Sequence, residues 1–254
     1  MQLLGNIGAI AAHRGWHQDG APENSIAALE RAAGNGVDFV EMDTRRLADG
    51  TIVIHHDTTL DGVALGELDR SALAAHPEVA TLDDWSRRAG ELGVGVLAEL
   101  KEPGYEREVL DTLRTNLRGN RLDLFSFDAS AARAMSRLAP DHAVGLLTDV
   151  GRPEAATAAS IVDAARGAGA SFVGLNVRQT TEPILAALDA AGLGAAVWTV
   201  DRPADIVRLL ADRRVSTVIS DVPRQALAIR STMTGGLHEA SGAVRLLRAA
   251  ATMR

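Results

Sequence analysis

The chain has 254 residues, which suits one large domain or two small ones, and 46% of them are hydrophobic, enough for a sizeable core. Its net charge of −7 argues against a general nucleic-acid binder, which needs clustered Lys and Arg, although a local cationic pocket is compatible with an acidic surface. The absence of cysteine excludes disulfides, zinc–thiolate sites and a cysteine nucleophile.

The N-terminal residues 1–6 lack the basic start of a secretory signal. The apolar run Ile7–Ala12 is too short to cross a membrane, and no other run is long enough for a transmembrane helix. We therefore expect a soluble, cytoplasmic protein without a membrane span.

Short apolar runs alternate with longer segments of helical periodicity along almost the whole chain. The runs that predict strands are Ile7–Ala12, Phe39–Met42, Val94–Leu100, Leu122–Phe127, Ala143–Leu147, Phe172–Leu175, Ala195–Val200 and Thr217–Ile219. The segments that predict helices are Ser25–Ala33, Leu82–Leu92, Glu106–Leu117, Ala129–Leu138, Glu154–Ala168, Glu182–Ala191, Ala204–Leu210 and Pro223–Ile229. This α/β pattern predicts a (β/α)₈ TIM barrel, a fold of typically ~250 residues. A doubly wound open sheet is the alternative, and periodicity does not exclude it.

A short insertion is expected after the second strand. Asp49 and Gly50 form a turn signal, and Thr51–His55 has the character of a strand, which together predict a β-hairpin. The segment Asp57–Ala80 that follows is expected to be irregular.

No composition change marks a linker between domains. We therefore expect a single catalytic barrel domain for residues 1–254, with the core at about 7–230 and a tail at 231–254. Within that tail, Gly242–Met253 is apolar and basic, which indicates one last helix or a frayed end.

Carboxylates gather at the ends of the second and third barrel strands. Glu41 and Asp43 are two residues apart, so on a strand they point to the same side. Glu99, at the end of the next strand, adds a third carboxylate, and three oxygen ligands without sulfur suit a hard divalent cation, Mg²⁺ or Ca²⁺. The alternative is a solvated rim in which Glu41 and Asp43 pair with Arg45 and Arg46.

Two histidines, His13 and His56, each follow an apolar run and precede a turn. Imidazole titrates near neutrality, so two such groups beside a substrate can act as acid and base. His55 is expected to point away from His56, and either to pack in the barrel or to support the residues that form the site. The remaining histidines are assigned structural roles: His17, His76, His142 and His238.

Basic side chains lie close in sequence to both the carboxylates and the histidines. Arg14 suits bidentate phosphate binding, and its alternative is a surface ion pair with Glu23. Lys101 is two residues from Glu99 and shares its face, so it either contacts phosphate while Glu99 holds metal or forms a structural salt bridge with Glu99. Trp198, at the end of the seventh strand, fits a pocket wall and the core equally well.

Two further polar residues at strand ends receive no catalytic role. Asp221 ends the eighth strand, where capping the helix that begins at Pro223 is a sufficient role. Ser126 lacks the Gly-x-Ser-x-Gly context of a hydrolase elbow and is not assigned as a nucleophile.

Taken in order, these motifs resemble those of the glycerophosphodiester phosphodiesterase family. The matching segments are Ala12-His13-Arg14-Gly15, Pro22-Glu23-Asn24-Ser25, Glu41-x-Asp43, Asp49-Gly50, His56-Asp57, Leu60-Asp61, Glu99-Leu100-Lys101, Ser126-Phe127-Asp128, Trp198-Thr199-Val200 and Ile219-Ser220-Asp221-x-Pro223. Together they cover roughly residues 8 to 230.

The resemblance implies a (β/α)₈ fold and metal-dependent cleavage of glycerophosphodiesters to glycerol 3-phosphate and an alcohol. By matched position, the metal ligands are Glu41, Asp43 and Glu99, the acid–base pair is His13 and His56, and the phosphate contacts are Arg14 and Lys101. One alternative is a phospholipase D-like or lysophospholipase D-type enzyme, which predicts an exposed apolar rim for a lipid substrate. The other is a non-catalytic phosphate- or metal-binding barrel.

The sequence also departs from the family pattern. Asp61 is followed by Gly62-Val63-Ala64 where an Asp-Arg-Thr-Thr run is usual, and Ala98 and Asp201 replace residues that are often Glu- or Asn-like. The segment before Glu99 is short, so the additional lobe of larger members is minimal. The expected metal and acid–base residues are intact, whereas the head group of the substrate and the oligomeric state stay open.

Overall fold

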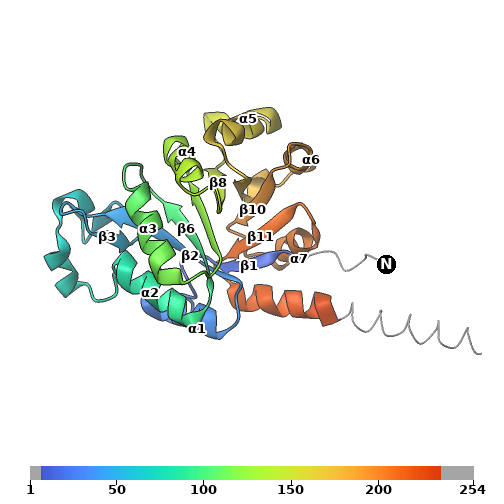
Figure 1. Ribbon diagram of the computed structural model, residues 1–254. Coiled ribbons are helices and arrows are strands. Elements are labelled where there is room, and N and C mark those ends of the chain that lie inside the picture. Colours follow the sequence, from blue (N-terminus) through green and yellow to red (C-terminus); the bar gives the residue numbers. More distant parts are fainter. Residues whose placement is uncertain (1–6, 236–254) are drawn as a thin grey trace, which may run out of the picture.

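A computed structural model describes residues 7–235 and shows a closed barrel of eight parallel strands surrounded by helices (Figure 1). The barrel strands are β1 (Ala9–Ala12), β2 (Phe39–Arg46), β6 (Gly95–Leu100), β7 (Leu122–Ser126), β8 (Ala143–Thr148), β9 (Phe172–Asn176), β10 (Gly194–Trp198) and β11 (Val215–Ser220). β1 pairs in parallel with both β2 and β11, which closes the sheet on itself. The prediction of a (β/α)₈ barrel is confirmed, and the open-sheet alternative is wrong.

Helices on the outside connect successive strands. They are α1 (Ile26–Gly34), α2 (Leu82–Leu92), α3 (Glu106–Leu117), α4 (Ala129–Leu138), α5 (Ala158–Ala168), α6 (Glu182–Ala190), α7 (Pro203–Ala211) and a last helix at 223–235. The start of α5 lies later than predicted because Pro153–Ala155 forms a 3₁₀ turn, η3, and Thr157 then begins the helix with a capping box to Ser160. The last helix extends past its predicted end at Ile229.

The insertion after β2 forms its own small layer. β3 (Ile52–Ile54) pairs antiparallel with β2, which confirms the predicted hairpin. The segment expected to be irregular contains β4 (Thr59–Leu60), β5 (Val63–Ala64) and the 3₁₀ turns η1 (Leu65–Glu67) and η2 (Arg70–Ala75). A satellite apolar cluster supports it, made of Leu47, Val53, Leu60, Leu65 and Val79.

The interior of the barrel is filled by one apolar layer to which every barrel strand contributes one residue. Its members are Ala11, Phe39, Leu97, Phe125, Leu147, Phe172, Ala196 and Ile219. A separate and larger apolar core lies between the sheet and the helices. Because side chains alternate along a strand, the residue two positions after each member of the layer points to the same interior, nearer the carboxyl ends of the strands.

Within residues 7–235, no helix is both long enough and apolar enough to cross a membrane. A short turn, η4 (Val177–Gln179), joins β9 to α6. Of the expected tail at 231–254, residues 231–235 belong to the last helix, whereas His238 and Gly242–Met253 lie outside the described residues.

Candidate active site

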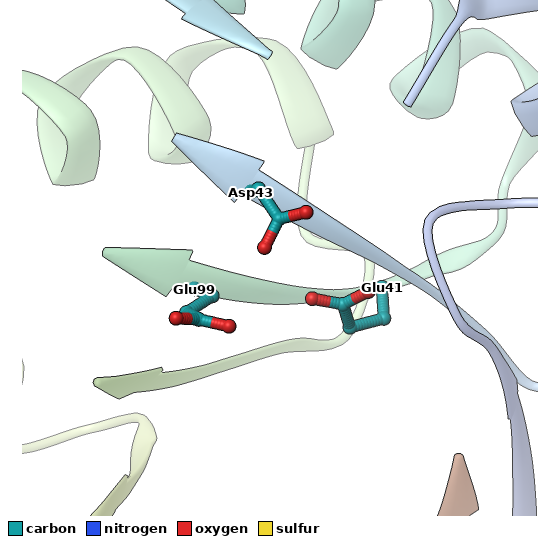
Figure 2. Close-up of side chains that lie close together, drawn as sticks. All are labelled: Glu41, Asp43 and Glu99. Atoms are coloured by element: carbon teal, nitrogen blue, oxygen red, sulfur yellow. The ribbon is translucent and has the colours of Figure 1, made fainter. Parts of the chain in front are cut away.

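Three carboxylates meet directly above the apolar layer of the barrel. Glu41 and Asp43 on β2 follow Phe39 at intervals of two residues, and Glu99 on β6 follows Leu97 in the same way. In the register of β2 with β6, Asp43 lies opposite Glu99. All three side chains are buried, and one oxygen of each lies within 4.8 Å of the others (Figure 2).

The neighbouring arginines do not form the solvated rim that was the alternative. Arg45 Nε donates a hydrogen bond to the carbonyl of His56 at 2.7 Å, and Arg46 Nη1 donates one to the carbonyl of Gly104 at 3.4 Å. Both therefore brace the surrounding loops, while Glu41 and Asp43 face the interior of the barrel.

Each carboxylate has a defined set of partners. Glu41 Oε2 accepts a hydrogen bond from the backbone N–H of Arg14 at 2.8 Å. Asp43 Oδ2 accepts one from Asn24 Nδ2 at 2.8 Å and lies 3.3 Å from Arg14 Nε. The other Asp43 oxygen and Glu99 Oε1 are buried and accept no well-aligned hydrogen bond within the described residues; Lys101 Nζ lies 2.8 Å and 2.9 Å from them.

Burial sets the protonation of this cluster. It raises the pKa of Glu41 to about 8, with a further contribution from the charge of Asp43. Burial likewise raises the pKa of Glu99 to about 7. Burial opposes the ionisation of Asp43, but the charge and hydrogen bond of Lys101, together with Arg14 and Asn24, outweigh burial and lower the pKa of Asp43. The cluster therefore lacks the positive charge needed to keep three buried carboxylates ionised, and its all-oxygen donor set fits a hard divalent cation.

His13 lies two residues beyond the apolar layer on β1, next to Glu41. Its Nδ1 donates a hydrogen bond to Asp221 Oδ1 at 2.8 Å, and its Nε2 lies 4.0 Å from Glu41 Oε2. Burial disfavours the imidazolium, but the hydrogen bond to Asp221 and the charge of Glu41 outweigh it, so the pKa of His13 is raised.

The sequence did not predict that this imidazole contacts Asp221, or that Asp221 also contacts His17. His17 Nε2 also donates to Asp221 Oδ1, at 3.1 Å, so its assignment to a purely structural role is incomplete. The carboxylate of Asp221 contacts these two rings, which is more than the helix-capping role assigned to it. The backbone N–H of Asp221 is in turn held by Asp201 Oδ1 at 2.8 Å.

His56 approaches from the loop after β3. Its Nδ1 donates a hydrogen bond to Asp57 Oδ1 at 2.8 Å, and burial lowers its pKa. His55 binds the carbonyl of Thr59 through Nε2 at 3.0 Å, which agrees with its expected separation from the site. For both His13 and His56, a carboxylate occupies Nδ1 and leaves Nε2 available for proton transfer.

A cavity of about 140 Å³ brings these groups together at the carboxyl ends of the strands. Its lining consists of His13, Arg14, Glu41, His56, Glu99, Lys101, Phe125, Phe127, Leu147, Trp198, Thr199 and Ile219. Trp198 packs edge-on against Phe127 with 5.5 Å between ring centroids, so it forms a pocket wall. A larger groove of about 660 Å³ beside α1 and α2 contains none of these residues.

Other polar residues stand apart from the cavity. His76 lies between Asp61 and Glu78 in the insertion. Ser126 Oγ donates a hydrogen bond to the carbonyl of Leu100 at 2.6 Å, a structural contact that agrees with its exclusion as a nucleophile. His142 lies near Asp141, also away from the cavity lining.

Comparison with known proteins agrees with this geometry. A model of the glycerophosphoryl diester phosphodiesterase family matches residues 13–88 and 91–225. The glycerophosphodiester phosphodiesterase of Caldanaerobacter subterraneus subsp. tengcongensis is 27% identical over 236 residues, which cover 84% of this chain and 94% of that protein. 

Solved structures share the fold. The crystal structure of a glycerophosphodiester phosphodiesterase from Parabacteroides distasonis has a TM-score of 0.77 at 23% identity, covering 90% of this chain and 99% of that one. An Oleispira antarctica phosphodiesterase in complex with the product sn-glycerol-3-phosphate has a TM-score of 0.74 at 21% identity, covering 89% of this chain and 97% of that one. The chain therefore belongs to the glycerophosphoryl diester phosphodiesterase family of phosphoric diester hydrolases.

Proposed function

We propose that this protein hydrolyses glycerophosphodiesters to glycerol 3-phosphate and an alcohol, with Mg²⁺ or Ca²⁺ held by Glu41, Asp43 and Glu99. The observation that carries the proposal is the meeting of three buried carboxylates with two imidazoles at one mouth of the barrel. The product in the Oleispira antarctica structure, sn-glycerol-3-phosphate, supports the same product here.

Positive charge is the first requirement of this reaction, because an anionic phosphodiester repels a nucleophile. A bound divalent cation supplies that charge and stabilises the additional negative charge of the transition state. Arg14 and Lys101 line the same cavity, which supports their proposed role as contacts of the phosphate oxygens. Arg14 also forms the ion pair with Glu23 that was its alternative role, at 2.9 Å.

The two imidazoles provide the acid and the base. One accepts a proton from the attacking hydroxyl, which belongs either to water or to the glycerol of the substrate itself, and the other protonates the departing alkoxide. Attack by the glycerol hydroxyl forms a cyclic phosphate first, which water then opens to glycerol 3-phosphate. Asp221 and Asp57 hold the rings of His13 and His56 in a fixed orientation. Each such group typically contributes 10²–10⁴-fold to the rate.

A water-soluble substrate is favoured over a lipid. The large hydrophobic side chains exposed within residues 7–235 are Val63, Val150 and Val207. They lie on the insertion, on the loop after β8 and on α7, and so do not form the contiguous apolar rim that a lysophospholipase D-type enzyme would present. In the cavity, Trp198 and Phe127 offer an apolar wall for the carbon skeleton of a small diester.

Alanine variants of the two imidazoles test the proposed roles. We expect His13→Ala and His56→Ala each to lower kcat by at least a factor of about 100, because each removes one proton-transfer group. His142→Ala, outside the cavity, serves as the matched control and should retain full turnover. Circular dichroism melting checks that the variants fold, and near-normal kcat in both cavity variants would refute the acid–base assignment.

A further inference from the structure

The ammonium of Lys101 bridges two of the three carboxylates. Lys101 directly follows β6, and its side chain is 9% exposed. Its Nζ lies 2.8 Å from Asp43 Oδ1 and 2.9 Å from Glu99 Oε1. Because opposite charges at this distance attract strongly in a buried setting, these two acids share the single positive charge of Lys101.

One of the two bridged oxygens, Asp43 Oδ1, is the oxygen of its carboxylate that is left for a metal ion. Asp43 Oδ2 is committed to Asn24 at 2.8 Å and lies beside Arg14 Nε, which leaves Oδ1 for a further cation. Neither Asp43 Oδ1 nor Glu99 Oε1 accepts a well-aligned hydrogen bond within the described part of the chain. The ammonium therefore covers oxygen atoms that the remaining protein does not satisfy.

Lys101 is also exceptional in the sequence. The chain contains 26 basic residues, and Lys101 is the single lysine among them; the other 25 are arginines. A guanidinium is broad, planar and presents five donors in a rigid fork, whereas an ammonium is a compact point charge on a flexible four-carbon stem. Residue 101 thus carries a compact positive charge on a flexible side chain that can move the charge to another site.

We infer that Lys101 is a tethered counter-cation that Asp43 and Glu99 share in the absence of metal, and that it moves to the substrate phosphate when a divalent cation binds. The inference rests on the proposed function, because it uses the same three ligands. Ca²⁺ and Mg²⁺ take carboxylate oxygens at roughly 2.0–2.6 Å, so a cation on these oxygens repels an ammonium that bridges them. Lys101 also lines the cavity, into which its stem can carry Nζ.

Metal affinity provides the first test. Calorimetric titration with Ca²⁺ compares the wild type with Lys101→Met, which keeps the length of the side chain without its charge, and with Lys101→Arg as the control that keeps the charge. We expect Lys101→Met to bind Ca²⁺ at least tenfold more tightly and its metal-free form to melt at a lower temperature. Lys101→Arg should bind no more tightly than the wild type. Equal or weaker binding by Lys101→Met would overturn the inference.

The second test measures the reactivity of Lys101, the single lysine, because this reactivity changes when the side chain leaves the two carboxylates. Acetylation of Nζ in the wild type is followed by mass spectrometry, with the α-amino group as internal reference. We expect saturating Mg²⁺ to accelerate acetylation several-fold and inorganic phosphate, added with Mg²⁺, to slow it again. If Mg²⁺ leaves the acetylation rate unchanged or lowers it, Lys101 is not released by the metal and the inference is overturned. If Mg²⁺ raises the rate but phosphate does not lower it again, Lys101 does not move to phosphate and that part is overturned.

These outcomes are separable from failure of the proposed function. A wild type that binds neither Ca²⁺ nor Mg²⁺ contradicts the proposed metal-dependent hydrolysis itself. A wild type that binds the cation while Lys101→Met binds it no more tightly leaves that function intact and removes only the role assigned to Lys101.

Discussion

Asp221 connects the proposed acid–base residue His13 to a second imidazole, His17, through a single carboxylate oxygen. Burial opposes the charge of Asp221, but the hydrogen bond and the charge of His13 outweigh it and lower its pKa to about 2. Asp221 therefore remains ionised across the physiological range. It contacts the ring of His13 and favours its protonated form, although it does not itself line the cavity.

Substituting Asp221 tests this positioning role. Asp221→Asn keeps the shape of the side chain but removes its charge, so we expect kcat to fall roughly 10–100-fold, the usual effect of losing such a supporting carboxylate, with little change in KM. Loss of the negative charge also lowers the pKa of His13, so the limb of the pH–rate profile that reports this group should move to lower pH. An unchanged profile together with unchanged kcat would contradict the role. His17→Ala should cost less, because the contact of His13 with Asp221 remains.

Local sequence explains which of these residues were predictable. Glu41 and Asp43 were identified because strand alternation places them on one face, and Glu99 because it lies at the end of the next strand. The structure brings the three together as expected. The partnership of His13 with Asp221 was not identified because 208 residues separate them. Only the pairing of β1 with β11, in which Ala12 lies opposite Ser220, brings these two strand ends together, and no local pattern carries that register.

Single elements of the fold also position the site. Helix α4 begins directly after the wall residue Phe127, and Asp128 caps it: Oδ1 accepts the backbone N–H of Ser130 at 2.8 Å and that of Ala131 at 3.0 Å. The hydrogen bond from the Ser130 side chain, followed by that from the Ala131 backbone, lowers the pKa of Asp128. The cap thus fixes where the chain leaves the cavity wall and enters the helix.

Removal of this cap should depend on pH. Asp128→Ala should lower the free energy of unfolding by about 1 kcal/mol at pH 7, as for other N-cap losses. Since the folded-state pKa of Asp128 is depressed, the charge-dependent part of this contribution is complete above about pH 4 and is lost as the pH falls through the folded-state pKa. Urea unfolding at pH 7 and at pH 3 measures the difference, with the exposed Asp111→Ala in α3 as control. A difference from wild type that is equally large at both pH values would contradict this explanation.

In the insertion after β2, the sequence predicts some secondary-structure elements and not others. The hairpin was predictable because Asp49 and Gly50 provide a turn signal, and Gly50 indeed adopts a left-handed φ of 88°. The strands β4 and β5 and the 3₁₀ turn η1 were missed because two or three residues are too few to show a repeating apolar pattern. The turn η2 is longer, but it buries no residue and so has no apolar pattern to detect. Their stability comes from the satellite cluster around Val53, which only the folded chain reveals.

At the scale of the whole molecule, closure of the barrel creates the site. Six residues at the mouth lie two positions after a member of the apolar layer: His13, Glu41, Glu99, Phe127, Trp198 and Asp221. The apolar layer therefore lies directly beneath the cavity, and the next inward-facing position after each of these layer residues contributes a side chain to the site. Eight strand–helix units were predictable from alternating periodicity, but the choice between a barrel and an open sheet depends on the pairing of β1 with β2.

Charge is also distributed unevenly over the molecule. The chain carries a net charge of −7, yet the mouth of the barrel contains Arg14 and Lys101 beside its carboxylates. A divalent cation added to this set would make the cavity attractive to an anionic phosphodiester, while the acidic surface disfavours polyanions elsewhere. The proposed substrate class agrees with both features.

The central claim is metal-dependent release of glycerol 3-phosphate, and an enzymatic release assay measures it most directly. The protein is incubated with glycerophosphocholine, glycerophosphoethanolamine, glycerophosphoglycerol or a lysophospholipid, in Mg²⁺, in Ca²⁺ or in EDTA. We predict release of glycerol 3-phosphate from at least one water-soluble diester with Mg²⁺ or Ca²⁺, and none in EDTA. Turnover that persists undiminished in EDTA, or turnover of the lysophospholipid alone, would contradict the account.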